Sequence, residues 1–346
     1  MSTLSLAVVD DPFLDEHRSP EPHPERPERL AAARRAANSG ASRAGRVDVP
    51  LRPATHEELA RVHTSRYVEH LGRAAGGFTQ WDEDTYSVPK SVDVALRAAG
   101  GAVELVEALL SRRALRGVAL LRPPGHHARP DGAMGFCLLN NVAVAAAHAR
   151  ARGVARVLVL DFDVHHGNGT QEIFYATPEV LFVSLHQFPF YPGSGAAAET
   201  GTGEARGYTV NVPLSAHASD ATYTAAFDRI VAPIAHEFAP GLVLLSAGFD
   251  AHRDDPLGQM SLTGEAYRTM TRRLLEALPV ETPIGALLEG GYDLNALESS
   301  LAATLEALTG LEGVSDVSPA VSSVNPRHTE ELARAQSTAA EFWSLG

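Results

Sequence analysis

Residues 157–169 read VLVLDFDVHHGNG, in which four apolar residues lead directly into a cluster of polar ones. A short apolar run of this kind is typical of a buried parallel strand. Alternation along the strand end places Asp161, Asp163 and His165 on one side. Burying three such side chains together is costly unless something pairs them. The stretch therefore predicts a strand with a metal or catalytic site at its carboxyl end, although Asp and His at a strand end can also cap the next helix.

Similar apolar runs alternate with helical stretches along the chain. The runs lie at 118–121, 157–160, 180–185, 242–245 and 284–288, with a further candidate at 208–212. The expected helices, rich in Ala, Leu and Glu, lie at 91–110, 140–150, 221–236, 263–277, 295–308 and 330–343. This alternation predicts an α/β fold with a parallel sheet and helices on both faces. Residues 10–90 are expected to be rich in loops, and one domain is expected over residues 1–346.

The composition limits the classes of protein to which this chain can belong. The 346 residues carry a formal net charge of −13, and 45% of them are hydrophobic, as in soluble proteins with a large core. Lys and Arg form no block, which argues against a nucleic-acid partner. The sequence has no apolar run of about 18 residues and no basic N-terminal start, so a cytoplasmic protein without a membrane partner is expected. Because Cys137 is the single cysteine, a disulfide within the chain and a cysteine-only zinc site are excluded.

Further polar clusters follow other predicted strands, and parallel strands would bring them to one edge of the sheet. They lie at 122–128, 246–252 and 289–293. The tandem His126 and His127 point apart on an extended chain, which suits two different roles. Asp250 suits a third metal ligand or a helix cap, and Tyr292 suits a hydrogen-bond donor or an aromatic lid on the core. The remaining polar residues nearby are interpreted as ordinary loop residues: His252, Asp254 and Asp255.

An Asp-x-His pair together with a distant Asp supplies two carboxylates and one imidazole. Three such ligands with an open fourth position are typical of catalytic zinc. Zinc lowers the pKa of a bound water from about 15.7 toward roughly 7–9, and it polarises an amide carbonyl. A neutral histidine can move the water proton to the leaving amine, and a phenol can donate to the developing oxyanion. The residues therefore favour amide hydrolysis.

The order and spacing of these motifs resemble the histone deacetylase superfamily, within it the class II-like branch that includes bacterial amidohydrolases. The matching stretches are 23–30, 122–127, 135–141, 161–169, 183–195, 246–258 and 289–294. The resemblance implies the arginase/deacetylase-like α/β fold, with a central parallel sheet of about eight strands. It also implies a zinc-dependent deacylase with one Zn²⁺ per chain, which hydrolyses the amide of an N-acyl lysine, expected to be N-acetyl-lysine.

The resemblance also assigns the catalytic roles. It makes the zinc ligands Asp163, His165 and Asp250. His127 resembles the general base and acid, and His126 resembles an electrostatic partner that is hydrogen-bonded to Asp161. Tyr292 resembles the oxyanion donor. Class I members place an Asp beside the base, whereas this chain has Asn168, which fits the class II-like branch and should leave the base less basic.

Substrate and potassium contacts follow from the same resemblance. Phe136 and Tyr191 resemble the aromatic walls of an acyl-lysine tunnel, with Gly135 beside them. One rim carboxylate is expected among Asp82, Glu83 and Asp84. Arg29 is expected below the zinc, near an acetate exit. A structural K⁺ site is expected at Asp161, His165, Ser184 and Leu185.

Three alternatives remain beside this reading. A binuclear manganese ureohydrolase needs a carboxylate two places after the metal-binding histidine, where this chain has Gly167. An acetylpolyamine amidohydrolase shares the zinc chemistry, but polyamine-specific members can use an acidic gatekeeper where this chain has Leu257. A non-catalytic acyl-binding scaffold is disfavoured because His127 and Tyr292 are retained. The substrate is thus expected to be an acylated lysine, with an acetylated small amine as the alternative, and a homo-oligomer remains open.

Overall fold

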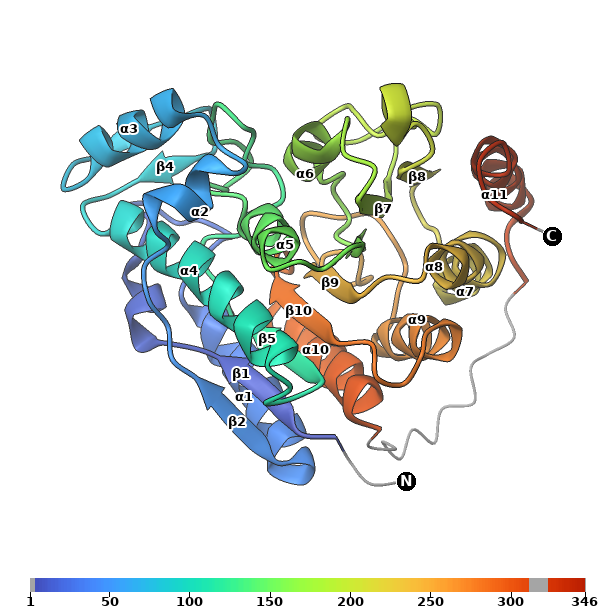
Figure 1. The fold of residues 1–346 in the computed structure, drawn as a ribbon, viewed down its shortest axis with the longest axis horizontal. Helices are drawn as coiled ribbons and strands as arrows, with labels where there is room; N and C mark the ends of the chain where they lie inside the picture. The colour runs from blue at the N-terminus through green and yellow to red at the C-terminus, as the bar shows by residue number, and fades with distance from the viewer. Residues whose placement is uncertain (1–3, 311–322, 346) are drawn as a thin grey trace.

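A computed structural model describes residues 4–310 and 323–345. The single domain predicted over residues 1–346 also includes 1–3, 311–322 and 346, which lie outside the described residues. Eight strands form one parallel sheet in the order β2-β1-β5-β10-β9-β6-β7-β8 (Figure 1). The strands are β1 (Leu6–Val9), β2 (Arg46–Val49), β5 (Arg116–Ala119), β6 (Val157–Asp161), β7 (Val180–Gln187), β8 (Thr209–Leu214), β9 (Leu242–Ala247) and β10 (Ile284–Leu288). A separate antiparallel pair joins β3 (Thr79–Gln80) to β4 (Tyr86–Ser87). The predicted parallel α/β sheet is confirmed.

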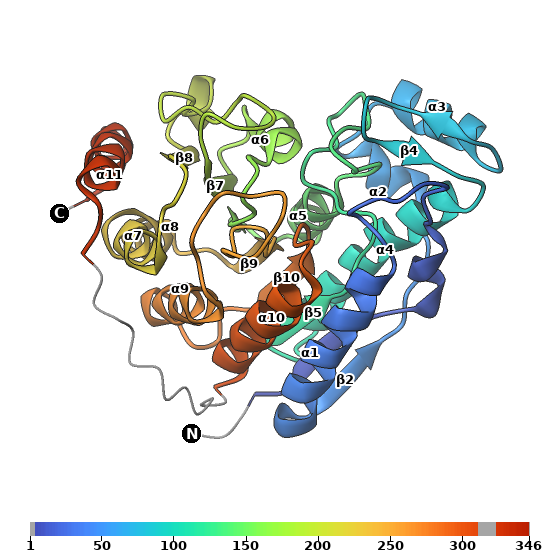
Figure 2. The same cartoon turned by 180° about the vertical axis from the view of Figure 1, so that it is seen from behind.

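Helices cover both faces of the sheet (Figures 1 and 2). On one face lie α4 (Ser91–Leu110), α5 (Asn141–Ala151) and α6 (Asn168–Phe174). The other face carries α1 (Glu28–Ala44), α10 (Leu294–Thr309), α9 (Gly264–Ala277), α7 (Asp220–Ala226) and α8 (Ala232–Phe238). The shorter or peripheral helices are η1 (Pro12–Glu16), α2 (His56–Ala60), α3 (Ser65–Ala74), η2 (Gly203–Ala205), the π-helical η3 (Phe227–Val231) between α7 and α8, and α11 (Pro326–Ala339) against β8. In the described residues, no helix is both long and apolar enough to cross a bilayer.

The N-terminal third is more regular than the sequence analysis predicts. Residues 10–90 contain α1, β2, α2 and α3, and β1 precedes them. The four residues of β1 are too few to show a period, and the buried face of α1 consists largely of alanines, such as Ala32, Ala33, Ala36 and Ala37. Strand β5 begins at Arg116, two residues before the predicted run, where it pairs with β1 and β10. The Arg116 guanidinium donates to the carbonyls of Val280 and Thr282 in the segment before β10.

Strand direction brings the polar clusters together. Because all eight strands are parallel, the segments after β5, β6, β9 and β10 leave the sheet at the same edge. The segments after β5 and β10 each end in a residue that caps the next helix. Asp293 accepts hydrogen bonds from the backbone N–H groups of Asn295 and Ala296 at the start of α10, and Asn140 caps α5 through the N–H of Ala143. The connection from β10 to Asp293 is therefore short, the connection from β5 to Asn140 is long, and each is anchored where its helix begins.

Candidate metal centre and active site

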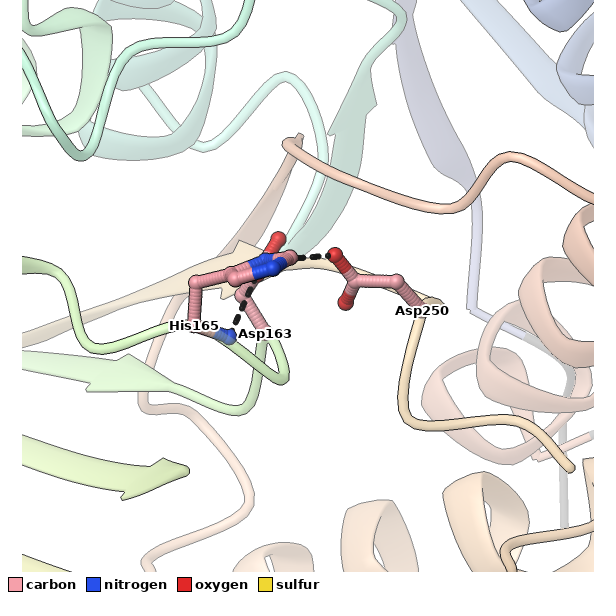
Figure 3. A group of neighbouring side chains, drawn as sticks. All are labelled: Asp163, His165 and Asp250. Atoms are coloured by element: carbon pink, nitrogen blue, oxygen red, sulfur yellow. Dashed lines mark hydrogen bonds and ion pairs between the residues drawn. The ribbon is translucent and has the colours of Figure 1, made fainter. Parts of the chain in front are cut away.

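The three expected metal ligands meet where β6 and β9 end (Figure 3). Nδ1 of His165 lies 3.2 Å from Oδ1 of Asp163 and 3.1 Å from Oδ2 of Asp250. One ligand atom from each of the three residues lies within 4.8 Å of the other two, so a single ion can reach all three. Both carboxylates are buried, and the imidazole is slightly exposed. The structure thus brings the expected ligands together, and their metal-binding role remains a prediction.

Backbone groups hold these carboxylates in place. The N–H of Gly290 donates to Oδ2 of Asp163 at 2.8 Å, and the N–H of Val164 donates to Oδ1 of Asp250 at 2.9 Å. A Cβ atom on Gly290 would lie 2.3 Å from Oδ2 of Asp250 and 2.6 Å from Oδ2 of Asp163. Only glycine therefore lets the loop after β10 approach the ligands this closely.

The electrostatics of the cluster fit a bound cation. Burial and the charge of Asp163 raise the pKa of the Asp250 carboxyl to about 7. Burial alone would lower the pKa of His165, but hydrogen bonds to Asp163 and Asp250 outweigh it and raise that pKa to about 10. Two buried anions thus stabilise positive charge between them. With oxygen, oxygen and nitrogen donors, the residues present fit a zinc ion held by two carboxylates and one imidazole.

His127 lies beside this centre, with its Nδ1 2.7 Å from Oδ1 of Asn168. Since an amide oxygen only accepts hydrogen bonds, this contact assigns the proton of a neutral imidazole to Nδ1 and leaves Nε2 free to accept one. Burial, followed by the neighbouring His126 and His165, lowers the pKa of His127 well below its usual value. His127 is therefore neutral at pH 7, as a general base must be.

His126 is in the opposite state. Its Nδ1 lies 2.9 Å from Oδ2 of Asp161. Burial disfavours its charged form, but Asp163 and Asp161 outweigh burial and raise the pKa well above the usual value. The rings of His126 and His127 lie only 4.0 Å apart, so the prediction that they point apart is wrong. The segment is a turn and not an extended strand, and the two residues still have different partners, as predicted.

Tyr292 is held through its backbone by a residue that the sequence analysis dismissed. Oδ2 of Asp255 accepts hydrogen bonds from the N–H groups of Tyr292 at 2.6 Å and Asp293 at 3.1 Å, and Oδ1 accepts one from Leu257 at 2.9 Å. Asp255 is buried, so its interpretation as an ordinary loop residue is wrong. Burial raises the pKa of the Tyr292 phenol well above its usual value, so the hydroxyl keeps its proton and remains a donor.

Arg29 lies fully buried behind the Tyr292 loop. It donates to the carbonyls of Gly291 at 2.6 Å and of Glu289, and its guanidinium lies 4.9 Å from the centre of the Tyr292 ring. Glu25 pairs with Arg29 at 3.1 Å and with Arg122. No local pattern in the sequence identifies Glu25 as the anchor of both arginines. These contacts place Arg29 against the segment that carries Tyr292, while its role at an exit channel remains a prediction.

Aromatic rings surround the approach to His127. Tyr191, 37% exposed, meets the His127 ring edge-on with 5.2 Å between centroids. Phe136 meets the Tyr292 ring edge-on at 5.8 Å. Phe190, which the sequence analysis did not select, stacks on His165 at 5.4 Å. Gly135 has φ +54°, and a Cβ there would lie 2.5 Å from Cδ2 of His127, so glycine is required beside this ring.

The three rim carboxylates lie in the turn between β3 and β4. Oδ1 of Asp82 accepts hydrogen bonds from the N–H groups of Asp84 and Thr85, which closes the turn. Partial burial and the neighbouring Asp82 raise the pKa of Asp84 to about 6. Thr85 accepts a hydrogen bond from the N–H of Phe136 at 2.9 Å, so the turn is joined to the segment that carries Phe136. Which of Asp82, Glu83 and Asp84 contacts a substrate remains open.

The remaining expected residues are also near the site. Asp161 and Ser184 are register partners on β6 and β7, which brings two of the predicted potassium ligands together. Leu185 follows Ser184 in β7 and is fully buried. Leu257 is partly buried in the segment that Asp255 holds. The potassium site and the gatekeeper position both remain predictions.

The sequence is similar to those of known proteins over most of this chain. The chain is 44% identical over 296 residues to histone deacetylase 15 of Arabidopsis thaliana, covering 84% of this chain and 53% of that protein. It is 41% identical over 310 residues to the polyamine deacetylase HDAC10 of Homo sapiens, covering 84% of this chain and 45% of that protein. The chain therefore spans about half the length of these relatives.

Structural comparison extends the likeness to the whole fold. The crystal structure of the HDA15 HD domain superposes with a TM-score of 0.91 at 39% identity, covering 99% of this chain and 96% of that one. The shared architecture is the arginase/deacetylase fold. The family described as the histone deacetylase domain matches residues 23–308, which include every candidate ligand and catalytic residue above. This chain belongs to the histone deacetylase family.

Proposed function

We propose that this protein is a zinc-dependent deacylase that hydrolyses the amide of an N-acyl lysine, with N-acetyl-lysine as its main substrate. The observation that carries the proposal is the convergence of Asp163, His165 and Asp250 on one point, with the neutral His127 beside them. Membership of the histone deacetylase family supports it. A structural K⁺ near Asp161 and Ser184 belongs to the same proposal.

Each residue then has a defined task. Asp163, His165 and Asp250 would hold a zinc ion, which supplies a Lewis acid that activates water and polarises the acyl carbonyl. Nε2 of His127 takes the proton from the attacking water and delivers it to the leaving lysine amine. The charged His126, paired with Asp161, stabilises negative charge that develops nearby. The Tyr292 hydroxyl donates a hydrogen bond to the carbonyl oxygen as it becomes an oxyanion.

Asn168 favours the neutral form of His127. It accepts the hydrogen bond from Nδ1 of His127 but carries no charge, so it orients the ring without making imidazolium favourable. His127 is therefore ready to accept a proton at neutral pH. Phe136 and Tyr191 flank the approach and suit the flat, apolar stem of an acylated lysine.

Two other functions are separable from this one. An acetylpolyamine substrate has the support of the human relative's name, and the apolar Leu257 argues against it because it cannot pair with an ammonium group. A second metal, as in a ureohydrolase, finds no carboxylate at Gly167, where a Cβ would lie 2.2 Å from Oδ2 of Asp161. The site of Figure 3 thus offers three ligands for one ion.

The test compares kcat/KM on an acetyl-lysine peptide, longer acyl-lysine peptides and acetylspermidine. The proposal predicts the highest value on an acyl-lysine peptide, with turnover that a chelator abolishes and zinc restores. Asp163→Ala and His127→Ala should remove turnover. Robust hydrolysis by Asp163→Ala would refute the site, and a preference for acetylspermidine would transfer the proposal to polyamines.

A further inference from the structure

Glu289 is a buried carboxylate that two neighbouring loops share. It follows β10 directly and is 1% exposed. Its Oε2 accepts hydrogen bonds from the backbone N–H groups of Gly125 at 2.6 Å and His126 at 3.1 Å. Its Oε1 accepts one from the hydroxyl of Ser246 at 3.2 Å. A single side chain thereby links the turn that carries His127 to the end of β9, four residues before Asp250.

The backbone of the same residue reaches the rest of the site. Its N–H donates to the carbonyl of Ala247 at 3.1 Å, and its own carbonyl accepts from Arg29. The next residue, Gly290, donates to Asp163. Glu289 therefore stands where the turn that carries His127, the end of β9 and the segment that carries Tyr292 meet.

The contacts show what the side chain supplies. The N–H groups of Gly125 and His126 point inward and away from solvent, so an unpaired one would carry the full cost of desolvation. Both are satisfied by one oxygen at the end of a three-carbon side chain. The turn that they fix aims the His127 ring, and a displacement of about 1 Å at a reacting group can cost about 10²-fold in rate.

We propose that Glu289 is a positioning residue, which sets the orientation of His127 through the reach of its side chain and the two backbone N–H groups that it binds. This proposal rests on the proposed deacylase function. Gln at this position keeps the reach, because its amide oxygen can accept from both N–H groups and its NH₂ can donate to Ser246. Asp keeps the charge but is one methylene too short.

The two substitutions therefore separate reach from charge. Glu289→Gln should keep kcat within about threefold of wild type, whereas Glu289→Asp should lower kcat by about 10–10²-fold, with KM changed less than threefold in both. A larger loss in Glu289→Gln, equal losses in both variants, or wild-type kcat in both would overturn the proposal. Glu58→Asp is the matched control, because Glu58 also binds a backbone N–H, that of Thr55, in the cap of α2.

Amide hydrogen exchange gives a readout that does not depend on turnover. In the zinc-loaded protein, Glu289→Asp should lower the protection of the amides in 125–128 by at least about tenfold, and Glu289→Gln and Glu58→Asp should leave it within about threefold. Unchanged protection in Glu289→Asp would contradict the proposal. If Glu289→Asp does not fold, Ser246→Ala decides instead, with a several-fold fall in kcat expected and an unchanged kcat overturning the proposal. If the wild type has no turnover, the proposed function is refuted. The hydrogen-exchange comparison would still test whether Glu289 positions the turn that carries His127.

Discussion

Asn168→Asp should move the pH dependence of the reaction toward higher pH. The substitution changes one amide into a carboxylate of the same shape, 2.7 Å from Nδ1 of His127. With about 4 Å between charge centres and an effective dielectric constant of about 20, the attraction for imidazolium is about 4 kcal/mol, or about 3 pKa units. Desolvation of the new carboxylate offsets part of this, so we expect the pKa of His127 to rise by about 1–3 units.

The sign of the effect follows from the role of the base. In the wild type the pKa of His127 is well below 6.5, so the neutral ring persists into mildly acidic solution. A raised pKa protonates the ring up to a higher pH, and catalysis is lost below that pH because Nε2 can no longer accept a proton. The acid limb of kcat/KM against pH should therefore shift upward by about 1–3 units.

The assay is a pH profile of kcat/KM on an acetyl-lysine peptide between pH 5 and pH 10, with zinc content checked at each end. Asn168→Ala is the control, because it removes the acceptor without adding charge and should not raise the acid limb. An acid limb that stays in place, or moves downward, in Asn168→Asp would refute the assignment of His127 as the base.

Three other substitutions test the remaining parts of the site. Tyr292→Phe should lower kcat about 10²–10³-fold with little change in KM, and an unchanged kcat would reduce Tyr292 to a packing residue. Asp255→Ala should lower kcat. It should also lower the free energy of unfolding by about 1–3 kcal/mol in urea titrations, because it leaves buried N–H groups unpaired. Asp254 is exposed, so Asp254→Ala should change neither kcat nor the free energy of unfolding. Gly135→Ala should lower kcat about 10²-fold because the added methyl group meets the His127 ring. Gly132 has open space around it, so Gly132→Ala should have the kcat of the wild type. Equal kcat values in the two variants would contradict the packing argument.

The sequence predicted the sheet and the convergence of Asp163 and Asp250 for the same reason. Asp163 and Asp250 each follow an apolar run that is long enough to identify as a buried strand, and parallel strands deliver their ends to one edge. Strand β1 escaped prediction because its four residues show no period. A turn leading into a helix was predicted at 23–29, but the length of α1 was not, because alanine gives a weak apolar signal. Complete burial alone does not make a strand predictable, since β1 is fully buried, and the apolar run must also be long enough to stand out in the sequence.

The supporting residues could not be predicted in this way. Asp255 binds the backbone of Tyr292, 37 residues later, and Glu25 pairs with Arg122, 97 residues later. Nothing within either segment indicates its partner, because the pairing exists only once the loops have folded together. The tandem histidines illustrate the same limit, since their ring directions depend on a turn that propensity does not reveal.

The central claim is that one divalent ion binds at Asp163, His165 and Asp250, and metal counting on the purified protein tests it most directly. Elemental analysis after dialysis against zinc should find one tightly bound ion per wild-type chain and close to none in Asp250→Ala. Two tight ions per wild-type chain, or one retained in Asp250→Ala, would contradict the account.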